Sequence, residues 1–154
     1  MDYTPLLAQL TALLQGETDL VANMANTAAV LYHHLPQINW VGFYLVRGDE
    51  LVLGPFQGLP ACVRLKRGHG VCWAAVEKQE TLIVPDVHAF AGHIACDSAS
   101  QSEIVVPVFN AGRVWGVLDI DAPVKARFDE ADKAFLEQAV NIFATAAFAR
   151  SKQI

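Results

Sequence analysis

The sequence predicts an α+β domain, in which helices from the two ends of the chain cover one face of a central antiparallel sheet. Apolar residues recur with helical spacing near both ends, over 5–34 and 129–150. The segments between them are rich in aromatic and β-branched residues, and short turns such as RGDE (47–50) and NAG (110–112) join them. Tight hairpins require antiparallel pairing, which excludes a doubly wound parallel sheet.

Two helices are expected at the N-terminal end. The first covers 5–14, with Thr4 as its cap and Pro5 at the first helical position. The second covers 18–34 and ends before Pro36. In both segments the apolar residues fall on one face, which is typical of helices that pack on a core.

The middle of the chain predicts short strands around one helix. Segments 38–46 and 51–56 form the arms of a hairpin. The shorter elements that follow are a strand over 62–66, a helix over 71–78 and a strand over 81–84. Segment 86–102 has no clear period, and irregular loops of that length are often functional.

The C-terminal part predicts another hairpin and a long helix. The strands cover 103–109 and 113–121, and the helix covers 129–150. Asp129 is its expected cap, and Asp132 three residues later makes an imperfect capping box.

Length and composition indicate one globular domain that spans residues 1–154. Hydrophobic residues make up 53% of the chain, and its net charge is −5. The acidic balance argues against binding to nucleic acid or to an anionic membrane. The N-terminus lacks the features of a secretory signal, and no apolar run approaches the ~20 residues that span a bilayer, so a cytoplasmic location is expected.

Strand alternation brings three carboxylates together on one face of the sheet. Asp119 and Asp121 share a face of the last strand. If NAG is a three-residue loop, Phe109 lies opposite Arg113 and Glu103 lies opposite Asp119. The acids would then meet on the face away from the terminal helices, where mutual repulsion keeps at least one carboxyl protonated and able to donate a proton. The alternative is a solvated strand face.

The chain has three cysteines, Cys62, Cys72 and Cys96, and none lies in a long apolar run. An odd number argues against a static disulfide framework. Cys72 lies in the first turn of the short helix, where the helix dipole favours the thiolate. Inert burial, metal ligation and redox chemistry all remain open on this evidence.

The cysteines could also belong to one of two other kinds of site, a zinc site or the active site of a hydrolase. A zinc site could combine them with His69, His88 and His93, but only His88 and His93 have a ligand-like spacing, so no metal is expected. A Cys–His–Asp hydrolase could use Cys96 with His93 and Asp97. Such partners normally come from different parts of a fold, so adjacency in sequence carries little weight.

Six segments together resemble the free methionine-(R)-sulfoxide reductases, which are single-domain proteins of the GAF fold. The segments are NWVGFYL (39–45), GPFQGLPAC (54–62), GHGVC (68–72), PDVHAFAGHIACDSAS (85–100), SEIVVP (102–107) and VWGVLDIDAP (114–123). The cysteines stand at the family's intervals, since 72 minus 62 is 10 and 96 minus 72 is 24. Trp73 departs from a glycine in the family pattern, and Ala91 departs from a proline.

The resemblance implies a thiol-dependent oxidoreductase that converts free L-methionine (R)-S-oxide to L-methionine. The reaction would pass through a cysteine sulfenic acid and an intramolecular disulfide, which a thioredoxin-type reductant recycles without a cofactor. The implied catalytic residues are Cys96 as nucleophile, Cys62 as the main resolving cysteine and Cys72 as a second redox partner. The implied substrate-binding residues are Trp40, Glu103, Asp119 and Asp121.

A second interpretation is a GAF module that senses a small molecule without turnover. It explains the fold and a pocket but leaves the three cysteines without a role. A homodimer through the terminal helices is also expected, because the last helix carries more apolar residues than one sheet contact needs. These residues are Ala139, Val140, Phe143, Ala146, Ala147 and Phe148.

Overall fold

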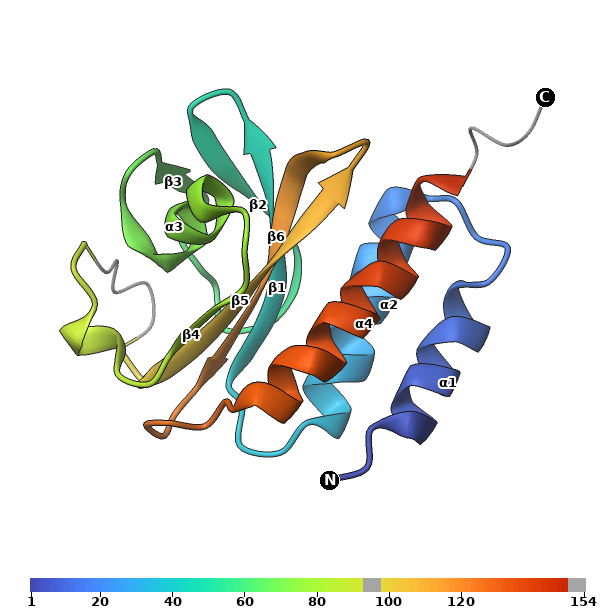
Figure 1. Cartoon of the computed structure of the whole chain (residues 1–154), viewed down its shortest axis with the longest axis horizontal. Helices are drawn as coiled ribbons and strands as arrows, with labels where there is room; N and C mark the ends of the chain where they lie inside the picture. The colour runs from blue at the N-terminus through green and yellow to red at the C-terminus, as the bar shows by residue number, and fades with distance from the viewer. Residues whose placement is uncertain (93–97, 150–154) are drawn as a thin grey trace.

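The computed structural model describes residues 1–92 and 98–149, and it confirms the predicted α+β class. Its six strands form one antiparallel sheet in the order β3-β2-β1-β6-β5-β4. Helices α1, α2 and α4 lie on one side of the sheet and α3 lies on the other (Figure 1). The elements are α1 (Thr4–Leu14), α2 (Leu20–His34), β1 (Trp40–Arg47), β2 (Glu50–Gly58), β3 (Arg64–Lys66), α3 (Gly70–Lys78), β4 (Leu82–Val84), the 3-10 turn η1 (Val87–Ala89), β5 (Ser102–Asn110), β6 (Arg113–Ala122) and α4 (Glu130–Ala147).

The N-terminal helices begin at caps that differ from the predicted ones. Tyr3, not Thr4, is the N-cap of α1. Its ring stacks on Phe135 of α4 with 4.0 Å between centroids, so the start of α1 is packed against α4. Helix α2 begins at Leu20, because the Asp19 carboxylate accepts a hydrogen bond from a backbone N–H of the first turn.

The capping box predicted for α4 is confirmed. The backbone N–H of Asp132 donates to Asp129 Oδ1, and the N–H of Asp129 donates to Asp132 Oδ2, each at 2.9 Å. Asp132 also forms an ion pair with Arg127 at 3.2 Å. Helix α4 ends at Ala147, short of the predicted 150.

The hairpin between β5 and β6 departs from the predicted register. Asn110 pairs with Arg113, so the turn has two residues, Ala111 and Gly112. Both have positive φ, of 53° and 77°, as a type I′ turn requires.

A bulge between Val108 and Phe109 then adds one more residue of shift. Glu103 therefore lies opposite Asp121, where Asp119 was expected. The total shift is two residues and side chains alternate with a period of two, so the three acids stay on one face.

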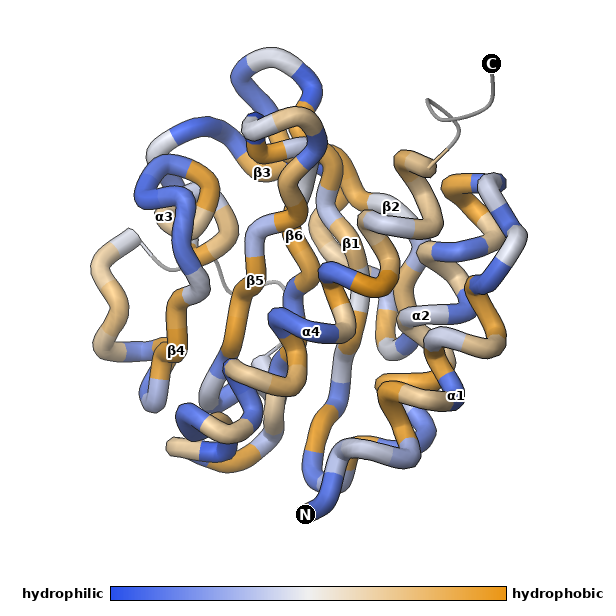
Figure 2. The backbone as a smooth tube through the Cα atoms, turned by 45° about the vertical axis from the view of Figure 1, so that its right-hand side comes forward, coloured by the Kyte–Doolittle hydropathy of each residue, from blue (hydrophilic) through white to orange (hydrophobic). Residues whose placement is uncertain are grey.

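The sheet separates two apolar clusters. The larger one fills the space between the sheet and α1, α2 and α4. The smaller one lies under α3 and includes Trp40, Tyr44 and Trp73. Hydrophobic residues run along β5 and β6, whereas hydrophobic and hydrophilic residues alternate around α4 (Figure 2). No helix in the described part of the chain is both long and apolar enough to cross a membrane.

Candidate active site

A row of residues crosses the sheet on the face that α3 covers. Trp40 of β1 pairs with Asp121 of β6, and Asp121 pairs with Glu103 of β5. Two residues further along β1, Gly42 lies opposite Asp119. Residues directly opposite each other in neighbouring strands share a face, so a tryptophan and three acids surround one point of the sheet.

The acids form a tight and mostly buried cluster. Glu103 is 7% exposed and Asp119 is 6% exposed, whereas Asp121 is half-buried. One carboxylate oxygen of Glu103, one of Asp119 and Sγ of Cys72 all lie within 4.8 Å of one another. Two acids and a thiol therefore share a space from which water is largely excluded, and Asp121 lies opposite Glu103 in the neighbouring strand.

Burial controls the protonation of this cluster. Desolvation raises the pKa of Glu103 well above its ordinary value, and the charges of Asp119 and Asp121 raise it further. Desolvation also raises the pKa of Asp119, and the neighbouring polar side chains of Glu103, Cys72 and Asp121 act in the opposite direction. Glu103 is thus the carboxyl that keeps its proton most firmly, which agrees with the expectation that one member of the group stays protonated.

Asp119 has one oxygen that no described residue contacts through a hydrogen bond. Its Oδ1 atom is buried and has no hydrogen-bond partner among the described residues. A buried acceptor without a partner is costly unless a ligand satisfies it. Gly42 lies directly opposite in β1, and the Trp40 ring and the Phe56 Cβ pack closely against it. An ionised carboxylate in this setting can accept hydrogen bonds from a cationic group.

Trp40 forms an aromatic wall beside the acids. It is 3% exposed, and its ring stacks on Tyr44 and Phe56 with centroids 5.9 and 5.3 Å away. Its Nε1 donates a hydrogen bond to the carbonyl oxygen of Leu59 at 3.0 Å. A Cβ atom at Gly58 would lie only 2.6 Å from Cδ1 of the ring, so glycine is needed there.

Tyr44 is a residue of this site that the sequence analysis did not single out. Its hydroxyl donates to the backbone oxygen of Cys62 at 2.8 Å and so ties the loop after β2 to β1. Burial raises its pKa, with further contributions from Asp119 and Cys72. Alternation along NWVGFYL was the available signal, because Trp40, Gly42 and Tyr44 share a face.

Cys72 lies over the acids in the first turn of α3 and is 4% exposed. Desolvation raises the pKa of its thiol well above the ordinary value, and Asp119, Glu103 and Asp121 raise it further. The expected thiolate is therefore wrong, because burial and three neighbouring acids outweigh the helix dipole.

Trp73, which replaces a glycine of the family pattern, has a structural role. The side chain is fully buried, and its Nε1 donates to the Leu65 carbonyl oxygen at 2.7 Å. The guanidinium of Arg67 lies 4.5 Å above the ring. These contacts fasten α3 to β3. Ala91 is exposed.

Three of the predicted site residues, Cys96, His93 and Asp97, lie outside the described residues. His69 and His88 are exposed. The described residues that could together ligate a metal are instead Cys72, Glu103 and Asp119.

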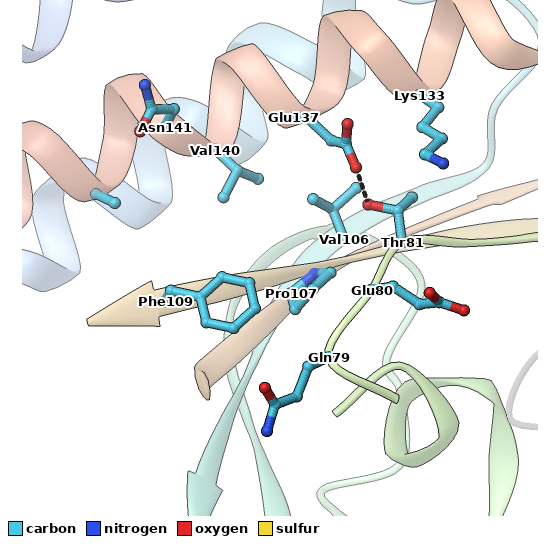
Figure 3. A pocket seen from close by; sticks show the side chains of 11 residues that line it. Gln79, Glu80, Thr81, Val106, Pro107, Phe109, Lys133, Glu137, Val140 and Asn141 are labelled. Carbon is cyan, nitrogen blue, oxygen red and sulfur yellow. Dashed lines mark hydrogen bonds between the residues drawn. The ribbon is translucent and has the colours of Figure 1, made fainter. Parts of the chain in front are cut away.

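A groove of about 330 Å³ lies on another part of the surface, between α4 and the segment that leads to β4 (Figure 3). Thr81 Oγ1 donates to Glu137 Oε2 at 2.6 Å across it. It has no cysteine and none of the three clustered acids among its lining residues. Its chemistry therefore differs from that of the cluster under α3.

Comparison with known proteins places this geometry in a family. Residues 9–147 match the GAF domain. Protein YtsP of Bacillus subtilis is 57% identical over 139 residues, which are 89% of this chain and 85% of that protein. The free methionine-R-sulfoxide reductase of Escherichia coli is 51% identical over 138 residues, which are 90% of this chain and 84% of the enzyme.

A solved structure gives the same assignment. The free methionine-R-sulfoxide reductase of Neisseria meningitidis, in complex with its substrate, superposes with a TM-score of 0.93 and 48% identity. The match covers 99% of this chain and 92% of that chain. The fold and the sequence thus agree, and this chain belongs to the free methionine-(R)-sulfoxide reductase family of GAF domains.

Proposed function

We propose that this chain reduces free L-methionine (R)-S-oxide to L-methionine with its own thiols. The observation that carries the proposal is the buried pair of Glu103, whose pKa is raised well above its ordinary value, and Asp119, whose Oδ1 has no hydrogen-bond partner among the described residues. A sulfoxide reductase needs a proton donor for the sulfoxide oxygen, and a free amino acid brings an ammonium group that a carboxylate can bind.

The substrate would lie between the acids and the aromatic wall. Asp119 Oδ1 and the half-buried Asp121 offer acceptors for the substrate ammonium. Trp40 provides an apolar surface against which the S-methyl group can pack. Glu103 lies across from Asp121 and can reach an oxygen bound in the same space.

The chemical step assigns the remaining roles. The thiolate of Cys96 attacks the substrate sulfur while Glu103 donates its proton to the sulfoxide oxygen. The oxygen passes to Cys96, which becomes a sulfenic acid, and methionine leaves. The Cys62 thiol then attacks this sulfur, water departs, and a Cys62–Cys96 disulfide forms. A thioredoxin-type dithiol reduces the disulfide and is itself oxidised.

The loop over 86–102 is proposed to close the pocket and exclude methionine residues that are part of a protein. The ends of this loop are tied together, since Val87 donates its N–H to the Gln101 oxygen at 2.9 Å. Asn39 Nδ2 donates to Ser100 Oγ at 3.2 Å, so the loop is also joined to the start of β1.

The decisive experiment measures consumption of the separate R and S isomers of free methionine sulfoxide, with dithiothreitol as reductant. We expect turnover of the R isomer and none with Cys96→Ser. Peptide-bound methionine sulfoxide is the control for free-amino-acid specificity. Binding of the R isomer without turnover by the wild type would instead favour a sensing module.

A second experiment tests the resolving step. The reduced protein is treated with one equivalent of substrate, alkylated and mapped by mass spectrometry. We expect a Cys62–Cys96 linkage with Cys72 alkylated only after unfolding, because that thiol is buried. A Cys72–Cys96 linkage would transfer the resolving role to Cys72.

A further inference from the structure

Three side chains from three elements converge in a way that suits a metal ion. They are Cys72 of α3, Glu103 of β5 and Asp119 of β6, and Sγ and one oxygen of each carboxyl lie within 4.8 Å of one another. The proposed reaction uses Glu103 and Asp119 but has no step for Cys72. This thiol is 4% exposed, so it is not placed to exchange disulfides with a partner in solution.

The spacing of the three atoms is close to that of a coordination site. Atoms that are no more than 4.8 Å apart all lie within about 2.8 Å of a common point, which is 4.8 Å divided by √3. Zinc binds cysteine sulfur at about 2.3 Å and carboxylate oxygen at about 2.0–2.2 Å. A zinc ion at that point therefore requires each ligand atom to move inward by less than about 1 Å.

A second observation, independent of the spacing, points to a ligand. Asp119 is 6% exposed, and its buried Oδ1 atom has no hydrogen-bond partner among the described residues. A buried acceptor in that condition needs an explanation, and an ion that it ligates is one. The cluster thus combines a set of ligands with an oxygen that lacks a partner.

The charges around the cluster also favour a cation. After burial, the groups that raise the pKa of Cys72 are its three acidic neighbours, Asp119, Glu103 and Asp121. As far as the structure describes the chain, neither Glu103 nor Asp119 forms an ion pair with a basic side chain. A divalent cation balances this negative charge, because metal binding releases the protons of its ligands.

The donor atoms select the kind of metal. Magnesium and calcium prefer sites made of oxygen alone, whereas a thiolate combined with carboxylates suits zinc. Three protein ligands leave the fourth tetrahedral position open to water. His69 and His88, which could have ligated zinc on sequence grounds, are exposed and do not belong to this group.

We propose that Cys72, Glu103 and Asp119 form a zinc site through which the metal reversibly inhibits the reductase. Zinc at this position takes the place of the Glu103 proton and occupies the Asp119 oxygen that the substrate ammonium would use. The inhibition rests on the proposed function, whereas the metal site does not.

Helix α3 is anchored well enough to present the thiol to the acids. The next residue, Trp73, is fully buried and hydrogen-bonded to Leu65 of β3. The guanidinium of Arg67 lies 4.5 Å from its ring. The two acids lie on paired strands, so all three ligands come from a fixed frame.

The first test measures zinc binding to a Cys62→Ser/Cys96→Ser protein, in which Cys72 is the only cysteine. With a chromogenic chelator as competitor, we expect one zinc ion per chain. Addition of Glu103→Gln should weaken the affinity by about 100-fold or more, since loss of a residue that merely supports a ligand costs about 10- to 100-fold.

The controls separate loss of a ligand from loss of the fold. Glutamine has the shape of a protonated glutamic acid, and circular dichroism checks that the variant is folded. Glu80→Gln, at an exposed position, should bind zinc as the parent protein does. Absence of binding by the parent, or equal binding by Glu103→Gln, would overturn the site.

Cobalt(II) identifies the sulfur ligand directly, because it binds to the same types of ligand as zinc. In the Cys62→Ser/Cys96→Ser protein it should give a sulfur-to-cobalt charge-transfer band, which disappears in Cys72→Ala and remains in His69→Ala. A bound cobalt ion without this band would exclude Cys72 as a ligand and overturn the site as proposed.

Competition with the substrate tests the inhibition. Free methionine (R)-S-oxide should weaken zinc binding to the Cys62→Ser/Cys96→Ser protein, because metal and ammonium would share Asp119 Oδ1. Zinc that the R isomer does not displace would overturn the inhibition. If zinc binds through the three residues but the metal-free wild type lacks reductase activity, the proposed function fails while the metal site stands.

Discussion

Glu103 illustrates at the scale of one residue how a functional group is kept at a cost to the sheet. It lies directly opposite Asp121, and like charges in that arrangement destabilise paired strands. The side chain is buried, so solvent cannot screen the repulsion between the two carboxylates. Protonation of Glu103 removes it. The same proton is the one that the proposed chemistry transfers.

Replacing Glu103 by glutamine tests the proton donor. Glutamine has the shape and charge of the protonated acid but cannot transfer a proton. We expect Glu103→Gln to lower kcat by about 10²- to 10⁴-fold, the usual contribution of general acid catalysis, with little change in substrate affinity. Glu80→Gln, at an exposed position, is the matched control. An active Glu103→Gln enzyme would assign the proton to another group.

The pKa of Glu103 also predicts how stability depends on pH. Its folded-state pKa is raised above the unfolded value of about 4.3. Folding therefore favours the protonated form, and this contribution is complete below the unfolded value and is lost as pH rises through the folded one. Thermal denaturation from pH 4 upward should show a larger fall of Tm in wild type than in Glu103→Gln. Parallel curves would contradict the assignment.

At the scale of elements, sequence alternation predicted the site better than it predicted the register. The faces of β5 and β6 follow from the period of two, so Glu103, Asp119 and Asp121 could be grouped without a structure. The predicted pairing of β5 with β6 was wrong by two residues, because the turn type and the bulge at Val108 depend on local backbone conformation. The protonated state of Cys72 could not be predicted either, since it depends on burial by distant segments.

The pairing of β1 with β2 sets the position of the aromatic wall, because Gly42 lies opposite Phe56. A Cβ atom at Gly42 would lie 2.5 Å from the Phe56 Cβ and against the Trp40 ring. We expect Gly42→Ala to lower stability by about 1–3 kcal/mol through overpacking and to weaken substrate binding. In Gly54→Ala the nearest atom would lie at 3.2 Å, so a smaller loss of stability is expected. Chemical denaturation and KM measurements compare the two, and equal effects would contradict this account.

At the scale of the whole molecule, the sheet separates the residues that contribute most to stability from those of the candidate site. The larger cluster, on the side of α1, α2 and α4, contains most of the buried aliphatic residues. The site lies on the other side, under α3. Phe143 belongs to the larger cluster, is fully buried and packs 5.0 Å from Phe43 between ring centroids. Substitutions there should change stability without changing the chemistry of the acids.

Phe143→Ala tests this division. Removal of a buried phenylalanine typically costs about 3–5 kcal/mol, so the Tm should fall markedly. The kcat of the fraction that remains folded should be close to wild type, because Phe143 does not touch the acid cluster. Circular dichroism and activity at a temperature well below the Tm provide the two measurements. A large loss of kcat in folded protein would show that the two sides of the sheet are coupled.

The proposed homodimer through the terminal helices depends on what those helices leave exposed. The apolar residues of α4 that suggested it are buried in the larger cluster or packed against it, so they already have intrachain partners. Leu13 of α1 and Val21 of α2 remain, at 43% and 63% exposure. If the dimer forms, Leu13→Glu/Val21→Glu should convert it to a monomer, while Val124→Glu, at an exposed apolar position outside these helices, should not. Sedimentation velocity at micromolar concentration measures this, and a monomeric wild type would rule the dimer out.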